Sequence, residues 1–138
     1  MAGSWLRSLH KKWEALVGRH FKPGVALVVV VYNMPEQAKK TLYSLTSQYQ
    51  QGVTEADYDV IIIENQSANN LPVDFIESLP ANFSYHLRAE TEPTPVFAAN
   101  YGIKLSRRSH IALLIDGARM VTPGVVKNLL REIGRAHV

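Results

Sequence analysis

The sequence predicts an α/β fold in which helices flank a parallel sheet. Short apolar runs that are rich in β-branched residues and lack polar alternation indicate strands buried on both faces. There are three such runs, over residues 25–31, 60–63 and 111–115. Segments with helical spacing separate them, and this alternation favours parallel strands joined by right-handed crossovers.

A polar residue follows each apolar run. These residues are Asn33, Glu64 and Asp116. The carboxyl ends of parallel strands share one edge of the sheet, and ligands of open α/β sheets bind there. We therefore expect the three side chains to converge on one cleft.

The first half of the chain predicts a helix, a strand, a helix and a strand. Residues 4–21 form an amphipathic pattern with Ser4 as N-cap, and Lys22-Pro23-Gly24 ends it. A strand is predicted over 25–32, and Pro35 opens a helix that continues to Gln48. The polar connection 50–57 leads into a second strand over 58–64.

The second half continues the alternation. Helices are predicted over 73–79, over 96–106 and from Thr122-Pro123 to about residue 133, and strands over 83–87 and 110–115. We expect the four strands to form one parallel sheet in the order 3-2-1-4, numbered along the chain. Four strands followed by one helix predict a sheet that is incomplete.

Composition predicts a globular domain without metal-binding thiolates. The chain has 138 residues, is 46% hydrophobic and contains no cysteine, which suits a reducing cytoplasm. No apolar run approaches the ~20 residues of a membrane-spanning helix. The formal charge is +3, but residues 1–22 carry five basic side chains against one glutamate. The body is therefore nearly neutral, and no nucleic-acid partner is expected.

Both ends of the chain are expected to stand apart from the domain at 24–132. The basic N-terminal helix, residues 1–22, could lie on an anionic membrane surface through residues 4–21, or could dock its apolar stripe on the protein, which we favour. The last six residues, 133–138, read Ile-Gly-Arg-Ala-His-Val, which a widely used sequencing adapter encodes in one frame. We expect an adapter-derived tail; the alternative is an ordinary helix end at Gly134.

Several common site motifs are absent from the sequence. It has no G-x-G-x-x-G after the first strand, no G-x-x-x-x-G-K-[ST] and no H-x-x-x-H. A receiver-type signalling domain needs acidic residues after its first strand, where this chain has Tyr32-Asn33-Met34-Pro35. A nucleotidyltransferase usually has a glycine-rich basic loop there, which is also missing.

Four segments in order resemble the family 2 glycosyltransferases, which have the GT-A fold, a Rossmann-like α/β architecture. The resemblance covers residues 24–130, the nucleotide-binding half of that fold. The segments are Val30-Val31-Tyr32-Asn33, Asp59-Val60-Ile61-Ile62-Ile63-Glu64-Asn65-Gln66-Ser67, Ala98-Ala99-Asn100-Tyr101-Gly102-Ile103 and His110-Ile111-Ala112-Leu113-Leu114-Ile115-Asp116.

The resemblance implies a site for a nucleotide-diphosphate sugar. Its candidate residues are Tyr32, Asn33, Glu64, Asn100, Gly102, Asp116 and Arg119. A carboxylate such as Glu64 can accept the imide N–H of a uracil-like base, while backbone groups near Tyr32 pair with its carbonyls. Asn33 orients the first loop or serves only as a turn residue. Asn100 and Gly102 shape the helix face below the ribose or diphosphate, or only pack.

Two charge partners are expected for the diphosphate. In the family, the last acid of an Asp-x-Asp motif usually binds a divalent metal, but here the tripeptide is Asp116-Gly117-Ala118, and Ala118 cannot ligate. Either Asp116 alone holds a largely hydrated Mg²⁺ or Mn²⁺, or Arg119 pairs with the phosphates.

The family's catalytic base and acceptor site lie in its other half, so no catalytic residue is assigned. We expect a donor-binding part of a glycosyltransferase that is inactive by itself, for an unknown acceptor. The alternative is a non-catalytic nucleotide-binding module.

Overall fold

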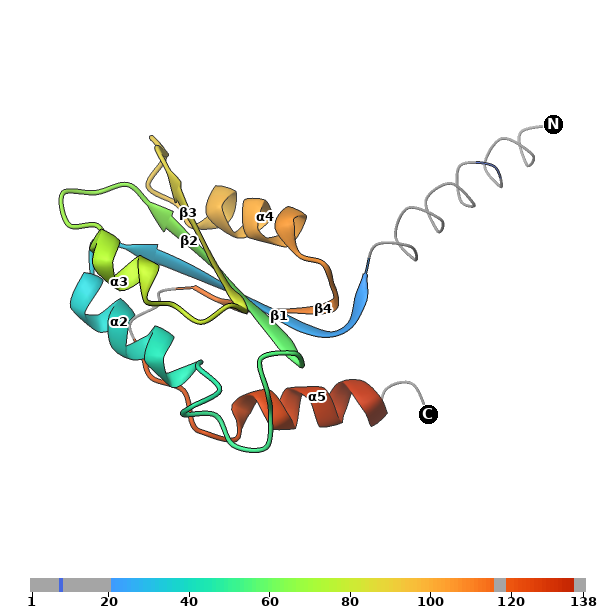
Figure 1. Ribbon diagram of the computed structural model, residues 1–138. Coiled ribbons are helices and arrows are strands. Elements are labelled where there is room, and N and C mark those ends of the chain that lie inside the picture. The colour runs from blue at the N-terminus through green and yellow to red at the C-terminus, as the bar shows by residue number, and fades with distance from the viewer. Residues whose placement is uncertain (1–7, 9–20, 116–118, 136–138) are drawn as a thin grey trace.

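Figure 1 shows a computed structural model in which a four-stranded sheet has helices on both faces. The structure describes Ser8, residues 21–115 and residues 119–135. The strands are β1 (Lys22–Tyr32), β2 (Tyr58–Asn65), β3 (Phe83–Arg88) and β4 (Arg108–Leu114). They lie in the order β3-β2-β1-β4, and every neighbouring pair is parallel. The predicted α/β class and strand order are thereby confirmed.

The larger part of the core lies on one face of the sheet. There α2 (Pro35–Ser44), α3 (Val73–Glu77) and α5 (Val125–Arg135) cover alternate residues of β1 and β2. Its fully buried members include Val25, Leu27, Val29, Leu42, Leu45, Val60, Ile62 and Val126. The aliphatic side chains on both faces of β1 and β2 explain why their sequence shows no alternation.

A smaller core lies on the opposite face, under α4 (Val96–Leu105). Val28 and Ile63 meet small residues of α4 there, including Ala98 and Ala99. Small residues allow α4 to approach the sheet closely, and Gly102 lies where a Cβ would be 2.4 Å from Val28 Cγ1.

Element boundaries differ from the predicted ones where tertiary contacts intervene. β1 begins at Lys22, because the Lys22 N–H donates to Arg107 O at 2.7 Å. An irregularity in the β1–β4 register follows, where Gly24 has a φ of 115°. α2 ends at Ser44 rather than Gln48, as the N–H groups of Leu45 and Thr46 turn back to Leu42 O and Tyr43 O.

Three predictions fall partly or wholly outside the described residues. The N-terminal helix is one, since only Ser8 and Phe21 of residues 4–21 are described, and Asp116 is another. At the other end, α5 continues to Arg135, and Ile133 packs against the larger core. The origin of residues 133–138 stays a prediction. Within the described part of the chain, no helix has the length and apolarity needed to cross a membrane.

Candidate functional site

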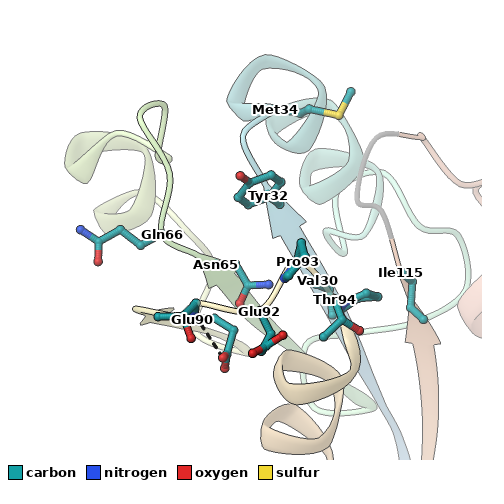
Figure 2. Close-up of a pocket in the computed structure, with 12 residues that line it drawn as sticks. Val30, Tyr32, Met34, Asn65, Gln66, Glu90, Glu92, Pro93, Thr94 and Ile115 are labelled. Carbon is teal, nitrogen blue, oxygen red and sulfur yellow. Dashed lines mark hydrogen bonds between the residues drawn. The ribbon is translucent and has the colours of Figure 1, made fainter.

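A cavity of about 390 Å³ opens at the carboxyl ends of β1 and β2 (Figure 2). This is where ligands of open α/β sheets bind, and the volume falls in the range of small-molecule sites. Its walls come from the ends of three strands and from the loop between β3 and α4. The lining residues are Val30, Tyr32, Met34, Asn65, Gln66, residues 90–95 and Ile115.

Tyr32 and Asn33 organise the β1 side of the site. The Tyr32 ring lines the cavity and is 61% exposed, so its face is open to a planar ligand. Asn33 has a φ of 53°, in the left-handed region that asparagine tolerates better than most residues. Its Oδ1 accepts a 3.1 Å hydrogen bond from Asn69 Nδ2, which joins the loops that follow β1 and β2. Asn33 itself is not part of the cavity wall.

Glu64 lies at the predicted edge of the sheet but faces away from the cavity. It is fully buried on the side of the larger core, where the Leu71 N–H donates to Oε1 and Oε2 at 3.0 and 3.2 Å. The Tyr85 hydroxyl also donates to Oε1. Burial, together with this bond to Glu64, raises the pKa of Tyr85, so its proton stays on the phenol. In this arrangement the Glu64 carboxylate is occupied within the protein and does not reach a ligand in the cavity.

The next residue, Asn65, takes the position that had been expected for Glu64. Successive strand residues point to opposite faces, so Asn65 lies on the side of α4 and lines the cavity. In Figure 2 its amide projects between Tyr32 and the loop that carries Glu90. Asn65 is only 8% exposed, and its Oδ1 has no hydrogen-bond partner among the residues that the structure describes. An unpaired buried acceptor is costly and requires an explanation.

Two carboxylates supply the charge of the described cavity wall. Glu90 and Glu92 both belong to the loop that follows β3. Behind Glu90, the Arg88 guanidinium lies 4.4 Å from the Tyr101 ring centre, with Nη2 3.7 Å from Glu90 Oε2. Tyr101 also contacts His86, and burial lowers the pKa of that imidazole. This cluster holds the base of the loop against α4.

The structure does not bring the two predicted α4 residues to the cavity. Asn100 is exposed and lies outside the lining. Gly102 is buried, and a Cβ there would meet Val28 Cγ1 at 2.4 Å and Ile63 Cγ1 at 3.2 Å. Close packing of α4 on the sheet therefore accounts for Gly102.

The phosphate end of the predicted site is described only in part. Asp116 and Ala118 lie outside the described residues, whereas Arg119 is described and exposed, away from the lining. Over Ser8, 21–115 and 119–135, no three His, Asp or Glu side chains come together as metal ligands. The described side chains by themselves therefore do not form a metal site.

Sequence reasoning missed Asn65, Glu90 and Glu92. Asn65 continues the alternate series Ile61, Ile63, Asn65 along β2, and this series was the signal that could have found it. These residues share the face of the sheet that α4, with its small residues, covers. For Glu90 and Glu92, the position of a two-proline loop directly after a strand end was the available indication.

Comparison with known proteins identifies the fold. No protein-family model matches the sequence, and no curated protein matches it. Among solved structures, S. aureus TarS 1-349 superposes with a TM-score of 0.69 at 15% identity, over 83% of this chain and 33% of that one. A second structure, S. aureus TarS, gives the same TM-score and identity, and 20% of that chain is covered. The chain thus spans a third or less of the proteins it resembles, and the likeness shows the fold alone, a GT-A/Rossmann-like α/β architecture.

Proposed function

We propose that the cavity binds the nucleoside of a nucleotide-diphosphate sugar, and that the chain is the donor-binding part of a family 2-like glycosyltransferase. The observation that carries this proposal is the buried, unpaired Asn65 Oδ1 in a cavity at the carboxyl ends of parallel strands. The glycosyltransferase-like fold supports it.

The chemistry of the cavity wall suits a nucleoside. An imide base offers one N–H between two carbonyls, and the Asn65 amide has a complementary acceptor and donor. A rotation about the Cβ–Cγ bond of Asn65 turns either amide atom toward the cavity. The open face of Tyr32 can stack on the base. Glu90 and Glu92 are acceptors for the hydroxyl groups of a ribose. In this proposal Glu64 positions the end of β2 and does not touch the base.

The same carboxylates would repel a diphosphate, so the phosphates must leave the cavity in another direction. Ile115 marks the other wall, and the chain continues from it to Asp116 and Arg119. We propose that the diphosphate lies there, with its charge balanced by Arg119 or by a divalent cation on Asp116. Asn33 would keep the β1 loop in place beside it.

Calorimetric titration of the chain with uridine and with UDP tests the base site. Asn65→Leu should weaken binding of both ligands about tenfold to a hundredfold, because one buried hydrogen-bonding group is lost. Asn128→Ala, on the exposed side of α5, is the matched asparagine control and should bind as the wild type does. If Asn65→Leu binds both ligands normally, the cavity is not the base site.

The phosphate end needs a separate comparison. Arg119→Ala and Asp116→Asn should each be titrated with uridine and UDP, with and without Mn²⁺. A loss confined to UDP places the diphosphate at this end. If only Asp116→Asn abolishes a Mn²⁺-dependent gain, the metal account holds; if Arg119→Ala removes the preference for UDP without metal, the arginine account holds. If each substitution weakened uridine and UDP binding equally, both the metal account and the arginine account would be contradicted.

A further inference from the structure

β4 is an edge strand with an apolar face that no described element covers. Ile111, Leu113 and Ile115 follow one another at two-residue spacing, and they are 40%, 43% and 52% exposed. The intervening Ala112 and Leu114 point to the other face, where they pack against the larger core. The exposed row pairs in register with Ala26 and Val28, so it lies on the same side of the sheet as α4.

α4 forms a wall beside this row without covering it. The helix packs over β1 and β2, and its flank toward β3 is set by Tyr101, which contacts His86 and Arg88. At 100° per residue, Val96 and Ile103 fall on the opposite flank, toward β4. They are 55% and 40% exposed. Ile111, Leu113 and Ile115 form the floor of the resulting surface, and Val96 and Ile103 of α4 form one wall. We refer to the surface made by these five residues as the β4 groove.

We propose that residues 4–20 dock in the β4 groove as a helix beside α4. The chain enters the sheet at one end of this groove, because the Lys22 N–H donates to Arg107 O at 2.7 Å, directly before β4 begins. A helix that ends near Gly18 would need a connection of about four residues to reach β1, which is an ordinary length. A helix is about 10 Å wide and spans roughly two strands, so beside α4 it would cover β4 and extend past the edge of the sheet.

The spacing of the apolar residues agrees with this placement. A helix rises about 1.5 Å per residue and a parallel strand about 3.3 Å. Measured back from Gly18, where the proposed helix ends, Trp13 would therefore lie about as far along the sheet as Ile111 does from Arg108. By the same reasoning Leu9 would lie near Leu113, and Trp5 near Ile115. The basic side chains of the segment fall largely off this stripe and would face solvent.

The full chain carries its own fluorescent reporter for this contact. It has two tryptophans, Trp5 and Trp13, and both are in the proposed helix. Docking predicts a blue-shifted tryptophan emission that is independent of protein concentration. Leu113→Asp should shift the emission to the red and raise acrylamide quenching at least twofold. Leu87→Asp is the matched control, because Leu87 is 48% exposed on the other edge strand and faces the opposite side of the sheet.

A crosslink tests the docking of residues 4–20 in the β4 groove even if the Leu113→Asp protein does not fold. The chain has no cysteine, so paired substitutions are unambiguous. Leu9→Cys with Leu113→Cys should form an intramolecular disulfide under mild oxidation, whereas Leu9→Cys with Leu87→Cys should not. Equal crosslinking of both pairs would overturn the proposal. So would a solvent-exposed emission that turns blue only with anionic phosphatidylserine vesicles, which indicates a membrane-surface helix. An emission that reddens on dilution would instead place the segment on a second copy of the chain.

Discussion

At the scale of single residues, Gly102 fixes how closely α4 can approach the sheet. A Cβ at this position would lie 2.4 Å from Val28 Cγ1, a distance that real side chains do not tolerate. Gly102→Ala should therefore push α4 outward and lower the free energy of unfolding by about 1–3 kcal/mol. Chemical denaturation followed by circular dichroism measures this difference.

Gly134 provides the matched control for that substitution. It also lies in a helix, but a Cβ there would meet no atom within 4 Å. Gly134→Ala should be neutral or stabilising by up to about 1 kcal/mol, because alanine is the better helix former. A Gly102→Ala protein as stable as Gly134→Ala would show that α4 packs less tightly than the structure indicates.

Residue types at the strand ends could be predicted from the sequence, but their directions could not. The apolar runs placed Asn33 and Glu64 at the carboxyl edge, where the structure has them. Glu64 and Asn65 are neighbours that face opposite sides of the sheet, and only one of the two sides holds the cavity. Because β1 and β2 are apolar on both faces, no alternation in the sequence marks which side is which.

At the scale of elements, the buried side chain of Gln50 joins two helices that are distant in sequence. Its Nε2 donates to Ser44 O at the end of α2, at 2.7 Å, and to Thr122 O, at 2.9 Å. Its Oε1 accepts from the Val126 N–H at the start of α5, at 3.1 Å. One amide therefore bonds three backbone groups at or next to the ends of helices. Of these, Thr122 O also accepts from the Val125 N–H at 3.2 Å.

Gln50→Leu removes all three bonds at once. Ser44 O, Thr122 O and the Val126 N–H would be left without this partner, and the free energy of unfolding should fall by about 3 kcal/mol. Thermal unfolding monitored by circular dichroism measures the loss. Gln51→Leu, at the exposed neighbouring position, should change stability by less than about 0.5 kcal/mol. Similar losses in both variants would argue against the bridging role of Gln50.

The same contact explains why one helix boundary could not be predicted. Residues 45–48 carry no helix-breaking residue, so local rules extended the helix to Gln48. The chain instead turns after Ser44, where Ser44 Oγ bonds Thr41 O at 2.6 Å and Gln50 caps Ser44 O. Gln50 is six residues from Ser44, but its side chain is also bonded to Thr122 O and the Val126 N–H, which are 72 and 76 positions away. No local pattern reveals those two bonds. Element types and order depend on apolar periodicity, by contrast, and from residue 22 to residue 135 they were predicted correctly.

At the scale of the whole molecule, the two ends of the sheet have separate roles. At the amino end, the buried Arg108 donates to both carboxylate oxygens of Asp59, at 2.8 and 3.1 Å, and to the carbonyls of Pro23 and Ala56, each at 2.9 Å. It thereby ties β4 to β1 and β2. The cavity with its unpaired Asn65 Oδ1 lies at the carboxyl end. Arg108 is thus fully paired at the amino end, and Asn65 Oδ1 is unpaired at the cavity. Asn82 Oδ1, directly before β3 at the amino end, is also buried without a partner among the described residues.

This division predicts opposite outcomes for two substitutions. Arg108→Lys keeps the charge but loses the planar fork, so the melting temperature should fall by roughly 5–10 °C, while uridine affinity measured well below that temperature stays unchanged. Asn65→Leu should leave the melting temperature unchanged or slightly higher, since an unpaired buried acceptor is replaced by an apolar group, while uridine affinity falls. Arg107→Lys, at the exposed neighbouring position, should change neither quantity. Loss of affinity in Arg108→Lys at a temperature where circular dichroism shows it folded would mean that the amino end of the sheet controls the shape of the cavity.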